Sequence, residues 1–107
     1  MSESADELEA RWRKHIPPEV PLEDVMRLVE ARFPMQWRSG TSGSHLIVVE
    51  DPDLRLAEEA GRVSGTRGGI LTISVVRGRY VKKWLVRSLL QAIDAKRKIE
   101  QARGSDA

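Results

Sequence analysis

One of only two histidines in this chain lies at a position suited to proton transfer. Gly43-Ser44-His45 follows a turn of small residues, 39–43, and precedes the apolar run 46–49. The end of a strand holds a side chain in a fixed direction and leaves it open to water, and histidine titrates near neutral pH. The position suggests that His45 is a general base. The plainer alternative is an ordinary half-exposed polar residue beside a glycine turn.

Two further residues near this turn could contact phosphate. Arg38 is expected on the polar side of a short strand, where its planar guanidinium could clamp a phosphate group. Ser44 could bind phosphate as well, although turn chemistry explains a serine at this position adequately. No cysteine–histidine pair or pair of carboxylates in the sequence offers a rival mechanism.

Composition excludes several classes of site. The chain has 107 residues, enough for one small domain, and contains no cysteine, so neither a disulfide nor a thiolate metal site can form. Its histidines, His15 and His45, are far apart in sequence, so we expect no zinc site and no cofactor. The first seven residues are acidic and lack an apolar core, and no apolar run could cross a bilayer. We therefore expect a cytoplasmic protein without membrane contact.

Charge is distributed unevenly along the chain. Residues 1–61 contain 7 Lys/Arg and 13 Asp/Glu, whereas residues 62–107 contain 11 Lys/Arg and 3 Asp/Glu. The second half would therefore attract a polyanion such as RNA. The alternative is a solvated basic helix that the acidic first half neutralises.

The apolar periodicity predicts three helices. The first covers about 4–15, with Leu8 and Trp12 as its apolar pair, and the second covers 21–33. The last begins near Val81, with a core stripe of Val81, Trp84, Leu85, Leu89, Ala92 and Ile93.

Alternating residues predict three strands between the last two helices. Met35 and Trp37 alternate with polar neighbours, and residues 44–50 and 70–76 form the next two strands. The connection 53–69 contains a possible helical turn at 54–60. The predicted fold class is α+β: a three-stranded antiparallel sheet with two helices on one face, plus an additional N-terminal helix. The predicted division is an N-terminal helical extension, 1–20, an α-β-β-β-α domain, 21–95, and a basic helix end or tail, 96–107.

The order of these motifs resembles the HicA toxins (YcfA-like proteins). The resemblance rests on Trp37-Arg38, on Gly43-Ser44-His45, on the strand 71–75 and on Arg87-Ser88-Leu89-Leu90, and it covers about residues 21–95. It implies a fold like a double-stranded-RNA-binding domain, cleavage of mRNA with His45 as the catalytic residue, and a HicB-like antitoxin as partner.

The resemblance also implies contacts to RNA from the last helix. Lys82 and Lys83 resemble the basic pair that double-stranded-RNA-binding domains place against phosphates, at a helix N-terminus that adds positive potential. Arg87, on the solvent side of the same helix, completes the predicted RNA-binding residues.

Three features depart from the family's pattern. Leu46 stands where a second histidine is common, Trp84-Leu85 replace a glycine-threonine pair, and the N-terminal segment and the connection 53–69 are longer. Two alternatives to a toxin stay open on the same fold: a non-catalytic RNA-binding module, and an adaptor whose basic half docks on an acidic protein.

Overall fold

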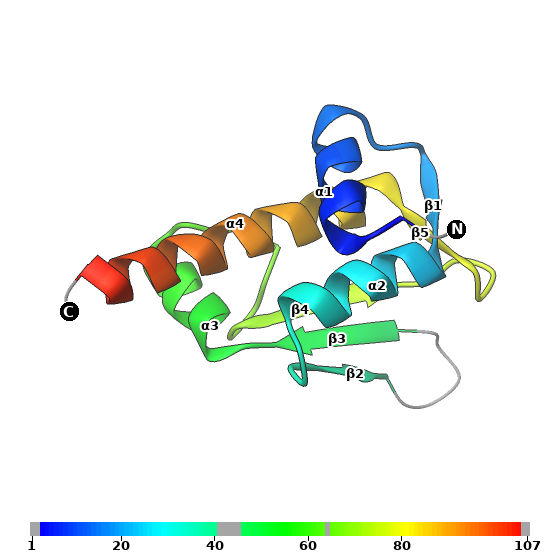
Figure 1. Cartoon of the computed structure of the whole chain (residues 1–107). Coiled ribbons are helices and arrows are strands. Elements are labelled where there is room, and N and C mark those ends of the chain that lie inside the picture. The colour runs from blue at the N-terminus through cyan, green and yellow to red at the C-terminus, as the bar shows by residue number, and fades with distance from the viewer. Residues whose placement is uncertain (1–2, 41–45, 64, 106–107) are drawn as a thin grey trace.

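Nine helices and strands form the part of the chain that the computed structural model describes, residues 3–40, 46–63 and 65–105. Figure 1 shows their arrangement. In chain order they are α1 (Ala5–Lys14), β1 (Glu19–Pro21), α2 (Leu22–Arg32), β2 (Trp37–Ser39), β3 (Leu46–Glu50), α3 (Pro52–Glu59), β4 (Ile70–Ser74), β5 (Tyr80–Lys82) and α4 (Lys83–Ser105).

The predicted three-stranded antiparallel sheet is confirmed, with strand order β2-β3-β4. Val49 on the middle strand lies opposite Trp37 on one side and Leu71 on the other, and Ile47 lies opposite Ile73. Apart from the half-buried Trp37, these side chains are buried, because alternate residues of a strand point to the same face. This face is the apolar side of the sheet.

The opposite face of the sheet is open to solvent at several positions, as predicted. Arg38, Val48 and Thr72 form one cross-strand row on this face. Arg38 and Thr72 are exposed, as is Ser74 at the end of β4, while Val48 is half-buried.

The prediction that Met35 begins the first of these strands is wrong. Met35 has a left-handed backbone, with φ of 63°, and its side chain is 97% exposed. Pro34 cannot continue the preceding helix, and the amide of Gln36 donates to the carbonyl of Phe33, which closes a turn. The strand therefore begins only at Trp37.

Helices α2 and α4 lie on the same side of the sheet (Figure 1). Both contribute to one core, which joins the inward residues of the sheet to Val25, Leu28 and Val29 of α2 and to Leu85, Leu89 and Ile93 of α4. This confirms the coarse α+β class, in which the helices bury one face of an antiparallel sheet.

Trp84 was predicted in the core stripe of the last helix, and this prediction is wrong. The helix begins at Lys83 and its buried stripe includes Val86 and Leu89, whereas the Trp84 side chain is 62% exposed. At 3.6 residues per turn, Trp84 lies about 140° around the helix from Leu89 and therefore faces solvent. Beyond residue 95 the basic segment continues the same helix, which is 23 residues long.

The N-terminal helix α1 is confirmed, and it packs tightly on the domain. Ser4 and Glu7 form a capping box at its start, with reciprocal hydrogen bonds between side chain and backbone. Leu8 and Trp12, the predicted apolar pair, are both buried in the common core.

A second, two-stranded antiparallel sheet was not predicted. It pairs β1 with β5, with Val20 opposite Val81, and the amide of Lys83 donates to the carbonyl of Pro18. Each strand has only three residues, and the two are about sixty positions apart, so no local pattern indicates their pairing. The sheet attaches the N-terminal segment to the start of α4.

The connection after β3 contains a helix rather than a single helical turn. Asp51 caps α3 by accepting a hydrogen bond from the amide of Asp53. The connection returns to α3 at Gly69, whose φ is 82°, and a Cβ there would lie 2.8 Å from the Cβ of Arg55. Only glycine fits this combination of backbone angle and close approach.

Two leucine-to-alanine substitutions test this packing. Leu89 is fully buried in the centre of α4, so Leu89→Ala should lower the free energy of unfolding by about 2–5 kcal/mol. Leu56 on α3 is 46% exposed, and Leu56→Ala should change it by less than about 0.5 kcal/mol. Urea denaturation of both variants measures the difference, and equal losses would contradict the helix orientation described above.

Candidate functional site

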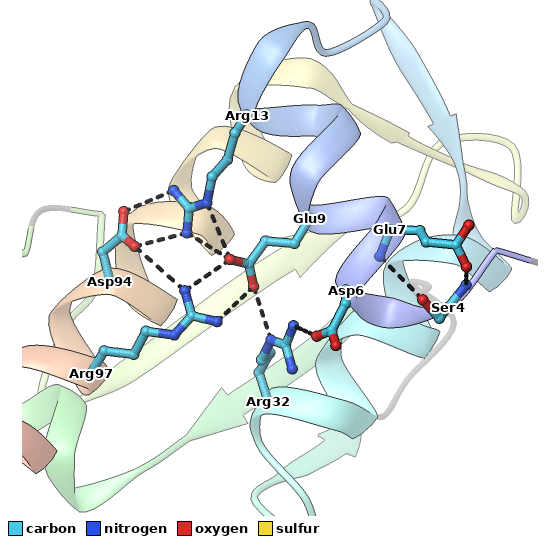
Figure 2. Close-up of polar contacts among 8 residues, drawn as sticks. All are labelled: Ser4, Asp6, Glu7, Glu9, Arg13, Arg32, Asp94 and Arg97. Atoms are coloured by element: carbon cyan, nitrogen blue, oxygen red, sulfur yellow. Dashed lines mark hydrogen bonds and ion pairs between the residues drawn. The ribbon is translucent and has the colours of Figure 1, made fainter.

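Part of the basic surface of α4 is neutralised within the protein, and one of the groups that neutralise it is a buried carboxylate on α1. Glu9 is only 7% exposed and accepts hydrogen bonds from three arginines (Figure 2). The Glu9 oxygens lie 2.8 and 3.1 Å from the Arg97 guanidinium nitrogens, 2.9 Å from Nε of Arg32 and 3.1 Å from Nε of Arg13. One carboxylate therefore joins α1, α2 and α4.

The surroundings of Glu9 favour its charged form. Burial, the largest single influence, would raise the pKa of Glu9, but hydrogen bonds from Arg97, Arg32 and Arg13 together lower it from 4.5 to about 2. Two further carboxylates complete the network: Asp94 makes a bidentate pair with Arg13, and Asp6 pairs with Arg32.

A second group of ion pairs joins the C-terminal half of α4 to the segment that begins α3. Lys96 Nζ lies 2.5 Å from the buried carboxylate of Asp51 and 5.0 Å from the centre of the Phe33 ring. Arg103 lies 2.7 Å from Asp53. The sequence left open that the acidic first half of the chain neutralises the basic last helix. The contacts of Lys96, Arg97 and Arg103 show that this holds for the C-terminal half of α4.

Glu19 on β1 neutralises two cations that precede α4 in the chain. Its oxygens lie 3.1 Å from Nζ of Lys82 and 2.7 Å from a guanidinium nitrogen of Arg77. Lys82, followed by Arg77, lowers the pKa of Glu19. Lys82 is therefore a paired cation in strand β5 and not, as predicted, part of the last helix.

Within the described ranges seven lysine and arginine side chains make no ion pair; four of them lie on or beside α4, and the other three are Lys14, Arg67 and Arg79. The four are Lys83, Arg87 and Lys98 on the helix and Arg62 beside it. Trp84, Arg87, Gln91 and Lys98 follow one another at intervals of three, four and seven residues, so they lie on one face. We call this surface the α4 strip: Lys83, Trp84, Arg87, Gln91 and Lys98, with Arg62 alongside.

The connection between α3 and β4 forms a groove with part of this strip. A cavity of about 350 Å³ lies between residues 61–63 and the helix, and Gln91, Asp94 and Lys98 line its helix side. Further toward the helix start, a Cβ at Gly65 would lie 3.3 Å from the Ser88 hydroxyl oxygen. The connection therefore runs beside α4 at both places.

The structure brings together only some of the predicted site residues. Lys83 and Arg87 share the α4 strip, and Lys82 immediately precedes it. Arg38 lies on the open face of the sheet instead, 3.7 Å from Glu50, so the sheet and its apolar face separate it from the α4 strip. His45 and Ser44 lie outside the described residues, immediately before the start of β3.

Four residues of this surface, Trp84, Gln91, Lys98 and Arg62, are not among the site residues predicted from the sequence. The spacing of Trp84, Arg87, Gln91 and Lys98 is present in the sequence, but the core stripe predicted for the last helix includes Trp84, so the pattern does not stand out. Arg62 had no local signal, because its position depends on how the connection packs against α4.

Comparison with protein-family models, with curated proteins and with solved structures found no match for this chain. The resemblance to HicA toxins therefore rests on the motifs of the sequence. No helix in the described ranges is long and apolar enough to cross a membrane.

Acid should lower the free energy of unfolding, because it protonates Glu9. Because the pKa of Glu9 in the folded state, about 2, lies below its ordinary value of 4.5, its stabilising effect is complete above pH 4.5 and is lost as the pH falls toward 2. At pH 7, Glu9→Gln should lower the free energy of unfolding by about 3 kcal/mol, and this deficit should shrink over the same pH range.

Glu30 provides the matched control, since it is exposed on α2 and forms no ion pair with another described residue. Glu30→Gln should change the free energy of unfolding by less than about 0.5 kcal/mol at any pH. Urea denaturation between pH 2 and 7 measures all three proteins. A Glu9→Gln deficit that stays constant with pH would contradict the assigned role of the carboxylate.

Proposed function

We propose that this protein is a HicA-like, RNA-binding toxin that holds RNA on the α4 strip and cleaves it by histidine chemistry. The observation that carries the RNA-binding part is the unpaired charge of Lys83, Arg87, Lys98 and Arg62 on one side of the molecule. Cations without a carboxylate partner can bind phosphates and release counterions, which is the main source of affinity for nucleic acid.

The first turn of α4 adds to this potential. It contains no acidic residue, so the partial positive charge of the helix N-terminus is not neutralised by its own side chains. Lys83 and Arg87 lie on this turn and the next. A phosphate near them would therefore meet side-chain cations and the positive end of the helix together.

The order of elements supports the HicA-like part of the proposal. From α2 to α4 the main elements follow the order expected of a double-stranded-RNA-binding-domain-like fold, α-β-β-β-α, with α3 and β5 inserted. His45 directly precedes β3, where the family's histidine would stand. In the proposed reaction His45 takes the proton of a 2′-hydroxyl, whose oxygen attacks the adjacent phosphorus. The bond from phosphorus to the 5′-oxygen of the next nucleotide breaks, this oxygen takes a proton from water, and a 2′,3′-cyclic phosphate is left.

The structure of α1 does not favour the adaptor alternative, because most of this helix is already in contact with the rest of the protein. Asp6, Glu9 and Arg13 of this helix pair with residues of α2 and α4, and the apolar pair Leu8 and Trp12 is buried. Little of α1 beyond its outer face is therefore left to dock on a partner protein.

The double substitution Lys83→Ala/Arg87→Ala tests the RNA interface. It should weaken RNA binding broadly across sequences and reduce the slope of log Kd against log salt by roughly 1.4 for single strands, which corresponds to two lost phosphate contacts. Lys82→Ala should have a smaller effect than Lys83→Ala, because Glu19 already pairs with Lys82.

Arg11→Ala is the control for this experiment, since Arg11 lies on α1 and pairs with Glu3 at 2.7 Å. Fluorescence anisotropy with a labelled RNA at several salt concentrations gives the affinities and slopes. An unchanged slope in the double variant, or an equal loss in Arg11→Ala, would remove the α4 strip from the interface.

His45→Gln tests the catalytic part of the proposal separately. Glutamine keeps a polar side chain of similar reach but cannot accept a proton at neutral pH, so cleavage and growth arrest should be abolished while RNA affinity stays nearly unchanged. Cleavage by the wild type should proceed in EDTA, leave 2′,3′-cyclic phosphate ends, and slow as falling pH protonates the histidine.

Gel analysis of an end-labelled RNA follows these products. Cleavage that survives His45→Gln would show that the glycine-serine-histidine motif does not carry the reaction. Wild-type protein that binds RNA but never cuts it would favour the non-catalytic RNA-binding module.

A further inference from the structure

Trp84 has no structural role that explains its place on the surface. Among the described residues three large apolar side chains are exposed, Met35, Leu56 and Trp84, and Trp84 alone lies between unpaired cations. Its neighbours Lys83 and Arg87 belong to the α4 strip. The buried stripe of the helix is filled without it, so the core does not require an aromatic ring at this position.

We propose that Trp84 is a base-stacking platform and that the α4 strip therefore binds an unpaired segment of RNA rather than a duplex. This inference rests on the proposed function and assigns the class of RNA that the strip takes. An exposed indole ring offers a flat face of the size of a nucleobase, and flanking cations hold the phosphates on either side of a stacked base.

The surroundings of Trp84 fit an unpaired base. Arg87 is one turn further along the helix and Gln91 two turns, so both are on the same face as the ring. The Gln91 amide can donate to and accept from a base edge. The hydroxyl of Ser88 is already engaged, since it donates to the carbonyl of Trp84 at 3.1 Å.

An A-form RNA duplex has no exposed base face on which the Trp84 ring could stack. Its bases are stacked on one another and its major groove is too deep and narrow for side chains to read, so proteins recognise it by backbone shape. A protruding indole would find no free base face there. The strip runs about 21 Å from Trp84 to Lys98, at 1.5 Å per helical residue, which leaves room for several nucleotides of a single strand.

The experiment compares two probes. One is a single-stranded 2′-O-methyl oligoadenylate of about 12 nucleotides, a length within the range that single-strand-binding domains cover, and the other is a duplex of the same length. The 2′-O-methyl group removes the attacking hydroxyl, so cleavage cannot alter the measured affinity. The proteins are the wild type, Trp84→Ala, Trp84→Phe, and Met35→Ala as an exposed apolar control.

Trp84→Ala should weaken binding to the single strand by roughly 5- to 150-fold, the effect of losing one stacked base, and Trp84→Phe should restore most of it. The salt slope should stay at the wild-type value because no charge is removed. Binding of the duplex should be weaker in the wild type and unaffected by either change. Met35→Ala should bind the single strand with wild-type affinity. All four proteins should have the same midpoint of thermal unfolding.

Fluorescence gives a second readout. Trp12 is buried and Trp37 is half-buried, so a change in indole emission when the single strand binds should come mainly from Trp84 and should disappear in Trp84→Phe.

The outcomes separate this inference from the proposed function. If Trp84→Ala binds the single strand as tightly as the wild type while Lys83→Ala/Arg87→Ala binds weakly, stacking is overturned and the RNA interface stands. Equal wild-type affinity for both probes would also overturn it. If the wild type binds neither probe, the proposed function fails and the stacking platform fails with it.

Discussion

The burial of Glu9 among three guanidinium groups is the constraint on which the arrangement of the helices depends. A carboxylate in the interior is costly unless its oxygens are paired and hydrogen-bonded. Arg13, Arg32 and Arg97 supply those bonds from α1, α2 and α4, so these helices must keep their relative positions for the charge to remain stable. The apolar contacts of Leu8 and Trp12 also hold α1 in place, so the N-terminal helix is part of the folded unit.

The ion pairs within the protein also determine which lysines and arginines of α4 have no carboxylate partner. The acidic residues of the first half contact the side of α4 that faces the protein and its C-terminal end, where they neutralise Lys96, Arg97 and Arg103. Arg87 and Lys98 are exposed, Lys83 is half-buried, and none of the three has a carboxylate partner among the described residues. The small net charge of +2 therefore conceals a local field on one helix face. The proposal that this surface binds RNA rests on this field, and the proposal that it binds an unpaired segment rests on the exposed ring of Trp84 among its cations.

The predicted site residues lie together in the structure where they are close in sequence, and lie apart where they are not. Lys83 and Arg87 are four positions apart on one helix, so their proximity followed from helical spacing. Arg38 was grouped with them, but it belongs to the open face of the sheet, in a different layer. Lys82 was assigned to a helix because no local pattern revealed that it pairs, as part of β5, with β1. His45 remains a prediction from the motif and from its position before β3.

The sequence by itself determined helices α1, α2 and α4, the three main strands and the inward face of each strand, because periodicity in apolar residues reflects contacts that each element must bury. It also indicated that the two halves of the chain carry opposite charge. Only the tertiary structure decided which of those charges neutralise one another, that Trp84 faces solvent, and that Arg62 lies beside Lys98. These properties depend on contacts between residues far apart in the chain, whose distances no local pattern contains.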